Sequence, residues 1–232
     1  MPTVQSPRLH LYVLLDRSGS MEPMRHDVIA GYNELVAEHR AAAANAGLEP
    51  RISLIEFDDV DSCEVIVDAV RVSKAPMLSV DDFVPRGMTP LLDATVRLLD
   101  RAESRVVSRA EAKRRPESIV VVTITDGEEN ASQHTTRKAL LARIRKLEKK
   151  GWTFAFFGAG LDAYTEAGAL GYDARSVQAW APDGTGAQSG FRSVSRAAMA
   201  RRQKLQSRDA YDTGDFFEGV KEAEDDRNRR SR

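Results

Sequence analysis

Cysteine, long apolar runs and excess charge of either sign are all scarce in this chain of 232 residues. Cys63 is the only cysteine, so no intrachain disulfide can form, and a reducing compartment is compatible with the sequence. No apolar segment approaches the roughly 20 residues that span a bilayer, and the run 11–15 is too short for the core of a signal peptide. The formal net charge of −1 supplies no overall field that would attract nucleic acid or an anionic membrane. We therefore expect a soluble, cytoplasmic protein that binds neither.

The apolar pattern alternates between strand-like and helix-like segments, which is typical of an α/β protein. Residues 9–15 and 118–125 are nearly continuous apolar runs, as expected for central strands covered on both faces. The acidic turn 58–61 is short enough to predict a hairpin, so the strand after it should run antiparallel to the others. The predicted fold is a doubly wound, Rossmann-like, mostly parallel six-stranded sheet with one antiparallel edge strand and helices on both faces. The other predicted strands are 51–57, 63–72, 153–157 and 176–180, and the predicted helices are 24–44, 91–107, 136–150, 162–170 and 191–205.

The composition divides the chain into three parts. We expect an N-terminal extension at 1–8, one α/β domain over 9–205 and a charged tail at 206–232. Within the domain, the segment 182–190 is rich in turn-forming residues and is predicted to be a linker before the last helix. The tail is mixed in charge and poor in apolar residues, a composition typical of flexible segments.

Oxygen-bearing side chains follow the two most apolar strands and occupy one loop between them. Asp16, Ser18 and Ser20 stand at alternate positions after the first strand, Thr89 lies in a loop punctuated by glycine and proline, and Asp126 follows the fourth strand. Ligands of α/β sheets bind beyond the carboxyl ends of strands, where the strand order reverses, so the two carboxylates meet if these strands are neighbours. A set of oxygen donors without His or Cys favours Mg²⁺ or Mn²⁺ over Zn²⁺.

Asp16-x-Ser18-x-Ser20, Thr89-Pro90 and Thr125-Asp126-Gly127, in this order, resemble the metal-ion-dependent adhesion site of von Willebrand factor A-type (VWA) domains. The resemblance covers residues 9–205 and all five site positions match. It implies that the two serines bind the metal directly, that Thr89 does so in some states, and that both aspartates bind directly or through water.

The resemblance also implies what the site is for. In this family a protein partner completes the shell of the metal, typically with an Asp or Glu side chain. Relatives of the bacterial intracellular type are often associated with AAA+ ATPases or stress-response proteins, so a partner of that kind is expected. Met88 stands where many members have a second glycine, which would stiffen the loop and argues against a large open/closed switch.

The tail offers a second source of a carboxylate. Two adjacent aromatic residues, Phe216 and Phe217, lie among acidic residues, as in a short recognition motif. One hypothesis is that Asp215 or Glu218 occupies the open metal position, in the same chain or in a neighbouring copy. The alternative is that the aromatic residues dock on the domain.

Other readings of the same residues stay open. Asp16 and the serines are also suited to cap the turn and the helix that follow. A metal-dependent hydrolase or phosphotransferase would use the same crevice with a nearby base, for which Glu128, Glu129 and His134 are the candidates. A third possibility is a self-assembling component whose copies are joined by the tail or the hairpin.

Overall fold

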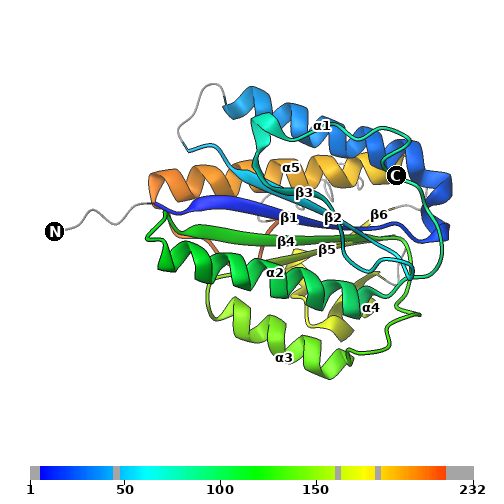
Figure 1. Ribbon diagram of the computed structural model, residues 1–232. Helices are drawn as coiled ribbons and strands as arrows, with labels where there is room; N and C mark the ends of the chain where they lie inside the picture. Colours follow the sequence, from blue (N-terminus) through cyan, green and yellow to red (C-terminus); the bar gives the residue numbers. More distant parts are fainter. Residues whose placement is uncertain (1–5, 44–47, 160–162, 181–183, 218–232) are drawn as a thin grey trace, which may run out of the picture.

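The computed structural model describes residues 6–43, 48–159, 163–180 and 184–217 (Figure 1). In chain order the elements are β1 (Arg8–Asp16), α1 (Arg25–Ala43), β2 (Arg51–Phe57), β3 (Glu64–Arg71), α2 (Leu91–Glu111), β4 (Glu117–Thr125), α3 (Arg137–Glu148), β5 (Thr153–Ala159), α4 (Ala163–Leu170), β6 (Val177–Trp180) and α5 (Gly184–Ser207). Short 3-10 turns lie at Gly19–Met24, Val72–Lys74 and Ala174–Ser176.

The sheet has six strands in the order β3-β2-β1-β4-β5-β6. All neighbouring pairs are parallel except β2 and β3, which form the predicted antiparallel hairpin at the edge. The predicted fold class is therefore confirmed. The strand order reverses between β1 and β4, which pair directly, so the crevice of this sheet lies at their carboxyl ends.

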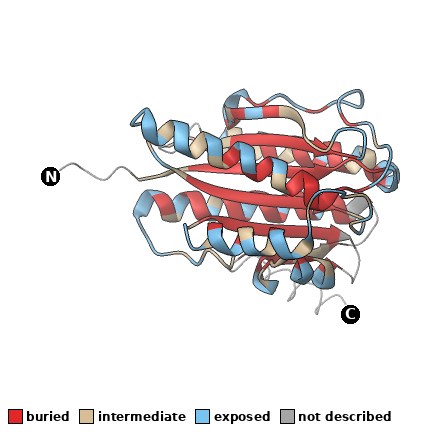
Figure 2. Cartoon of the chain, turned by 60° about the horizontal axis from the view of Figure 1, so that its bottom comes forward, coloured by how far each residue is buried: buried red, intermediate tan, exposed pale blue. Residues whose placement is uncertain are grey.

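Helices cover both faces of the sheet. Figure 1 shows α1 and α5 on one face and α2, α3 and α4 on the other. Successive side chains of β1 point to opposite faces of the sheet and so belong to two different hydrophobic cores. Leu11 and Val13 pack toward α1 and α5, whereas Tyr12 and Leu14 pack toward α2. Figure 2 shows the strands buried between layers whose outer surfaces are exposed, as expected for a parallel sheet.

The last helix corrects one prediction. The segment 182–190 was expected to be a linker, but α5 begins at Gly184 and includes most of it. Gly190, one of the glycines that indicate a turn, serves close packing instead. A Cβ atom on Gly190 would lie 1.9 Å from Cε1 of Phe157, so only glycine lets the helix approach β5 this closely.

The first part of the tail packs on the domain. Phe216 and Phe217 are buried in the core beneath α1 and α5, which is the docking alternative for these aromatic residues. The Oγ atom of Ser176 accepts a hydrogen bond from the Phe216 N–H (2.9 Å) and donates one to the Gly214 carbonyl (2.9 Å). The chain is thus anchored at the start of the edge strand β6.

No helix within the described residues combines the length and the apolar composition that a membrane span requires.

Candidate metal centre

All five predicted site residues lie together at the carboxyl ends of β1 and β4. Asp16 is the last residue of β1, and Asp126 directly follows β4. The Ser20 hydroxyl donates a hydrogen bond to Oδ1 of Asp126 (2.9 Å), and the Ser18 and Ser20 hydroxyl oxygens lie 3.0 Å apart. A Cβ atom on Gly127 would lie 3.3 Å from the Thr89 hydroxyl and 3.7 Å from that of Ser20, so these two hydroxyls face the same glycine.

Asp16 is held in place by both strands. Its Oδ1 accepts a hydrogen bond from the Ser18 N–H (2.7 Å), which shapes the turn after β1. Its Oδ2 accepts one from the Thr125 hydroxyl (2.5 Å), which also binds the backbone of Gly127. Thr125 was part of the sequence motif but was not predicted as a site residue. Its hydroxyl joins the loop of Asp16 to the loop of Asp126.

The loop that carries Thr89 is attached to both of its neighbours through the backbone. On one side, Gly19 N donates to the Gly87 carbonyl (3.1 Å). On the other side, Asn130 N donates to the Thr89 carbonyl (3.2 Å), and the Asn130 side chain accepts from Thr89 N (2.9 Å). Gly87 has a φ of +67°, and a Cβ there would clash with the Asp59 carboxylate at 1.8 Å. These bonds fix where the Thr89 hydroxyl lies.

No basic side chain among the described residues balances the two carboxylates of the site. Asp16 is fully buried, and burial raises its pKa to about 7, although hydrogen bonds from Thr125 and Ser18 oppose the shift. Burial also raises the pKa of Asp126, against its hydrogen bond with Ser20. Within the described part of the chain, no Lys, Arg or His side chain forms an ion pair with either aspartate.

Arg17 lies inside the motif, yet its side chain points away from the site. The buried guanidinium contacts three acidic side chains of the β2–β3 hairpin, which are Asp58 (2.9 Å), Glu56 (3.2 Å) and Glu64 (2.6 Å). Asp58 also accepts a hydrogen bond from Arg86 Nε (2.8 Å), in the loop of Thr89. The hairpin thereby ties two of the site's loops together. Sequence analysis missed this network, and the available signal was a basic residue directly after a buried apolar strand, in a turn of otherwise acidic, hydroxyl and glycine residues.

The predicted bases are not equally placed. The carboxylate of Glu129 accepts four hydrogen bonds, from Leu92 N (2.8 Å), Ala131 N (3.0 Å), Ser132 N (2.7 Å) and the Ser132 hydroxyl (2.7 Å). It therefore caps the start of α2 and organises its own loop. His134 is exposed, and its backbone N–H is bound by Asp93 (3.2 Å). Glu128 is exposed beside Asp126.

The donor set suits a hard divalent cation. It consists of two carboxylates and three hydroxyls, and Mg²⁺ and Mn²⁺ prefer such oxygen ligands. Among the described residues, no group of three or more His, Cys, Asp and Glu side chains is arranged to hold a metal. The candidate site is not such a group, because three of its five ligand side chains are hydroxyls. The residues present fit Mg²⁺ or Mn²⁺, because two unbalanced carboxylates call for a positive charge.

Comparisons with known proteins bear on the fold. No protein-family model and no curated protein matches the sequence. Among solved structures, the SpRpn10 VWA domain matches with a TM-score of 0.53 and 14% identity, over 80% of this chain and 94% of that one. This chain has the VWA fold.

Two further structures share the fold within longer chains. The pilus adhesin SpaC from Lactobacillus rhamnosus GG matches with a TM-score of 0.62 and 11% identity, over 84% of this chain and 30% of its own. Proximal thread matrix protein 1 from the mussel byssus matches with a TM-score of 0.57 and 18% identity, over 82% of this chain and 47% of its own. The chain thus spans less than half of either protein. At these identities the likeness concerns the VWA fold alone.

Proposed function

We propose that this chain is a protein-binding module with an intact metal-ion-dependent adhesion site. Mg²⁺, or Mn²⁺, is held by the hydroxyls of Ser18, Ser20 and Thr89, and by Asp16 and Asp126 directly or through water. The observation that carries the proposal is the convergence of two carboxylates and three hydroxyls at the switch point of a VWA fold, without a cation from the described chain.

The ligand set also supports the capture of an acidic group. Mg²⁺ prefers six oxygen ligands in octahedral arrangement, whereas the site offers five residues, of which three are neutral hydroxyls. The bound ion supplies a Lewis-acidic position that an outside carboxylate completes. The chain's own residues fix the direction of approach, since the hydrogen bonds of Thr89 and Asp16 hold the three loops in register.

The surface around the site supports a protein as the partner. Seven large apolar side chains are exposed in the described part of the chain, and five of them lie between residues 60 and 88. Met88, beside Thr89, is 51% exposed, and Val60 is 71% exposed on the turn whose Asp59 binds Met88 N. Exposed apolar residues beside a polar site are typical of protein interfaces. One structure of the same fold is a pilus adhesin. AAA+ ATPases and stress-response proteins are the partners that we would test first.

The enzymatic alternative has less support. Glu129 uses its carboxylate as a cap, and the cavity beside the site is lined by the carboxylates of Asp126, Glu128 and Glu166. Among the described residues, no basic side chain lines this cavity to bind the anionic oxygens of a phosphoester. For a self-assembling component, Phe216 and Phe217 are already buried in their own chain, so the tail would have to act through other residues.

The first experiment uses the metal alone. At a Mg²⁺ concentration of about 100 times Kd, binding to the folded state adds about 2.7 kcal/mol, or roughly 5–10 °C in Tm for a chain of this size. We expect this shift in the wild type and its loss in Ser18→Ala, Ser20→Ala and EDTA. Ser104→Ala, on the exposed face of α2, is the matched control and should keep it. An unchanged shift in both site variants would refute the assignment.

A second experiment tests the capture of a carboxylate. Random heptapeptides displayed on phage are selected on the wild type in Mg²⁺ and released with EDTA. The released pool should be enriched in Asp and Glu, and the same selection on Ser18→Ala should show no enrichment. A pool without acidic enrichment would reject capture of an acidic side chain, whether or not the metal binds.

A further inference from the structure

A cavity adjoins the candidate metal centre on the side of β5. It has a volume of about 200 Å³ and lies between the carboxyl ends of β4 and β5 and the start of α4. Asp126 and Gly127 belong both to its wall and to the metal centre. A ligand held at the metal therefore has this cavity beside it, on the side away from the β2–β3 hairpin.

The floor of the cavity is apolar and rigid. It includes the ring of Phe156, which packs edge-on against Tyr172 with ring centroids 5.2 Å apart, and the Tyr172 hydroxyl lies 2.9 Å from that of Thr123. Ala163, the first residue of α4, lies close to Gly158, where a Cβ atom would approach the Ala163 Cβ to 2.6 Å. The floor is thus formed in advance of any ligand.

The rim of the cavity is acidic. Its carboxylates belong to Asp126, Glu128 and Glu166, and no basic side chain lines it among the described residues. Glu166 already binds a guanidinium, since Arg137 Nη1 donates to its Oε1 at 2.8 Å. Asp126 faces the metal centre. Glu128 is exposed, and no ion pair joins it to another described residue, so one negative charge of the rim is left for an outside cation.

We propose that this cavity receives a Lys or Arg side chain of the partner protein, next to the acidic side chain that the metal captures. The inference rests on the proposed function and names the chemistry of its partner. The aliphatic part of the basic side chain lies on Phe156 and Ala163, and the charged end lies against Glu128, beside the ion pair of Glu166 and Arg137. The site then selects a pair of opposite charges rather than a lone carboxylate.

The size and charge of the cavity favour a single basic side chain over a small molecule, an acidic group or an apolar side chain. Pockets for small molecules usually begin at about 300 Å³, so this cavity suits a single side chain better. An acidic or phosphorylated group is excluded by the rim, and a purely apolar side chain would leave Glu128 without its cation. An extended peptide rises about 3.3 Å per residue. Because the cavity and the metal centre share a wall, the basic residue should lie within about three positions of the acidic one.

The peptide selection described above tests the inference when it is repeated on a paired variant. In the wild-type pool released by EDTA, we expect Lys or Arg to be enriched within three positions of the Asp or Glu. On the double variant Glu128→Gln/Glu166→Gln the acidic enrichment should remain and the basic enrichment should disappear. Glu111→Gln, a change of the same kind at the exposed end of α2, should give the wild-type pool.

A synthetic peptide from the wild-type pool provides the quantitative test. Replacing its basic residue by Gln should weaken binding to the wild type by about 5-fold and leave binding to the double variant unchanged within 2-fold. Circular dichroism confirms that each variant is folded. A pool without acidic enrichment rejects the proposed function and this inference with it. Acidic enrichment without basic enrichment, or basic enrichment that persists in the double variant, rejects this inference alone.

Discussion

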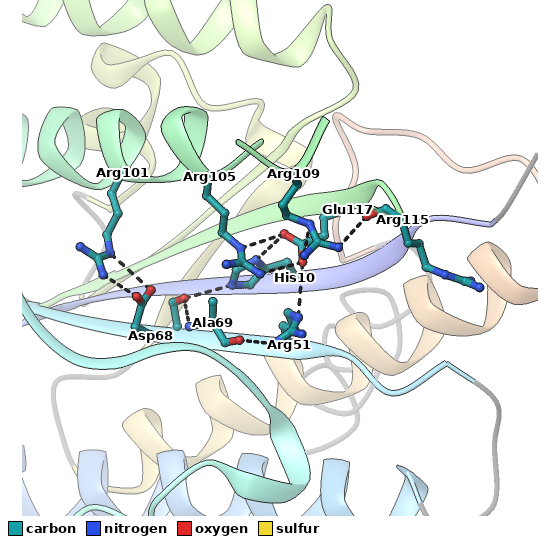
Figure 3. Close-up of polar contacts among 10 residues, drawn as sticks. His10, Arg51, Asp68, Ala69, Arg101, Arg105, Arg109, Arg115 and Glu117 are labelled. Atoms are coloured by element: carbon teal, nitrogen blue, oxygen red, sulfur yellow. Dashed lines mark hydrogen bonds and ion pairs between the residues drawn. The ribbon is translucent and has the colours of Figure 1, made fainter. Parts of the chain in front are cut away.

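Carboxylates lie at both ends of strand β4, and the chain treats them in opposite ways. At the amino end, Glu117 is surrounded by cationic side chains and a histidine (Figure 3). At the carboxyl end, the described residues supply only hydroxyls and backbone to Asp126 and to Asp16 across from it. The same sheet therefore contains a carboxylate with its counter-charges and a pair of carboxylates without any.

The contacts of Glu117 show how the chain stabilises a buried carboxylate. The side chain lies 3.1 Å from Arg105 Nε, 3.2 Å from Arg109 Nε and 3.5 Å from Arg51 Nε. Burial opposes its ionisation, but hydrogen bonds from His10 and Arg105 and the nearby positive charge lower its pKa to about 2. Burial lowers the pKa of His10, so at neutral pH the positive charge comes from the arginines.

The difference between the two ends indicates where an outside cation belongs. At Glu117, three arginines of the same chain balance one buried carboxylate. At the other end, Arg17 is adjacent to Asp16 and is directed to the hairpin instead. The missing charge is therefore expected from a bound metal ion, and variants at the two ends should respond in opposite directions.

The largest expected effect comes from Glu117→Gln. The variant leaves Arg51, Arg105 and Arg109 without their shared carboxylate, and loss of one partner from a buried ion pair costs about 3–5 kcal/mol. We expect the free energy of unfolding, measured by urea denaturation at pH 7, to fall by this amount. Glu111→Gln, exposed on the same helix as two of these arginines, should change it by less than about 0.5 kcal/mol. Equal effects of the two variants would show that the network contributes nothing specific.

The acid titration of Glu117 should be visible as a change in stability. Its pKa is about 2 in the folded chain and roughly 4.3 when unfolded, so the stability it provides is fully present above the unfolded value. As the pH falls from about 4.5 to about 2, the unfolded state binds the proton first and about 3 kcal/mol is lost. Urea denaturation across this range should show a fall in the wild type that is absent in Glu117→Gln. Parallel curves for the two proteins would contradict the assignment.

Much of this comparison was accessible from the sequence. Two apolar runs, each followed by an acidic residue, predicted that Asp16 and Asp126 would share one crevice if the two strands were neighbours, and β1 and β4 do pair. The alternation of strand-like and helix-like segments predicted the fold class, and the short acidic turn 58–61 predicted the antiparallel edge strand. These features depend on neighbouring residues along the chain, and such patterns are what a sequence shows directly.

The rest depends on contacts between distant segments. Gly190 resembled part of a turn because its packing against Phe157 is not visible in the local pattern. Glu129 resembled a possible base because the hydrogen bond from Leu92 N, which makes it a cap, depends on where α2 begins. Asp215 resembled a possible internal ligand, but the next residue is anchored at Ser176 beside β6, away from the cluster at β1 and β4. Glu218 lies outside the described residues.

The smallest expected effect is that of Asp126→Asn. It discriminates well because this variant should raise the free energy of unfolding, whereas Glu117→Gln should lower it. In EDTA, Asp126→Asn removes one of two carboxylates that burial penalises and that no described cation balances. Its Oδ1 can still accept the hydrogen bond of the Ser20 hydroxyl. We expect the free energy of unfolding at pH 7 to rise, by no more than about 1 kcal/mol because Asp126 is only partly buried. The charge is lost without a cavity or an unmade bond. Mg²⁺ should then add nothing to the variant, whereas it stabilises the wild type. A loss of stability in EDTA, of the kind expected for Glu117→Gln, would mean that Asp126 has a structural counter-charge and that the two ends of β4 are alike.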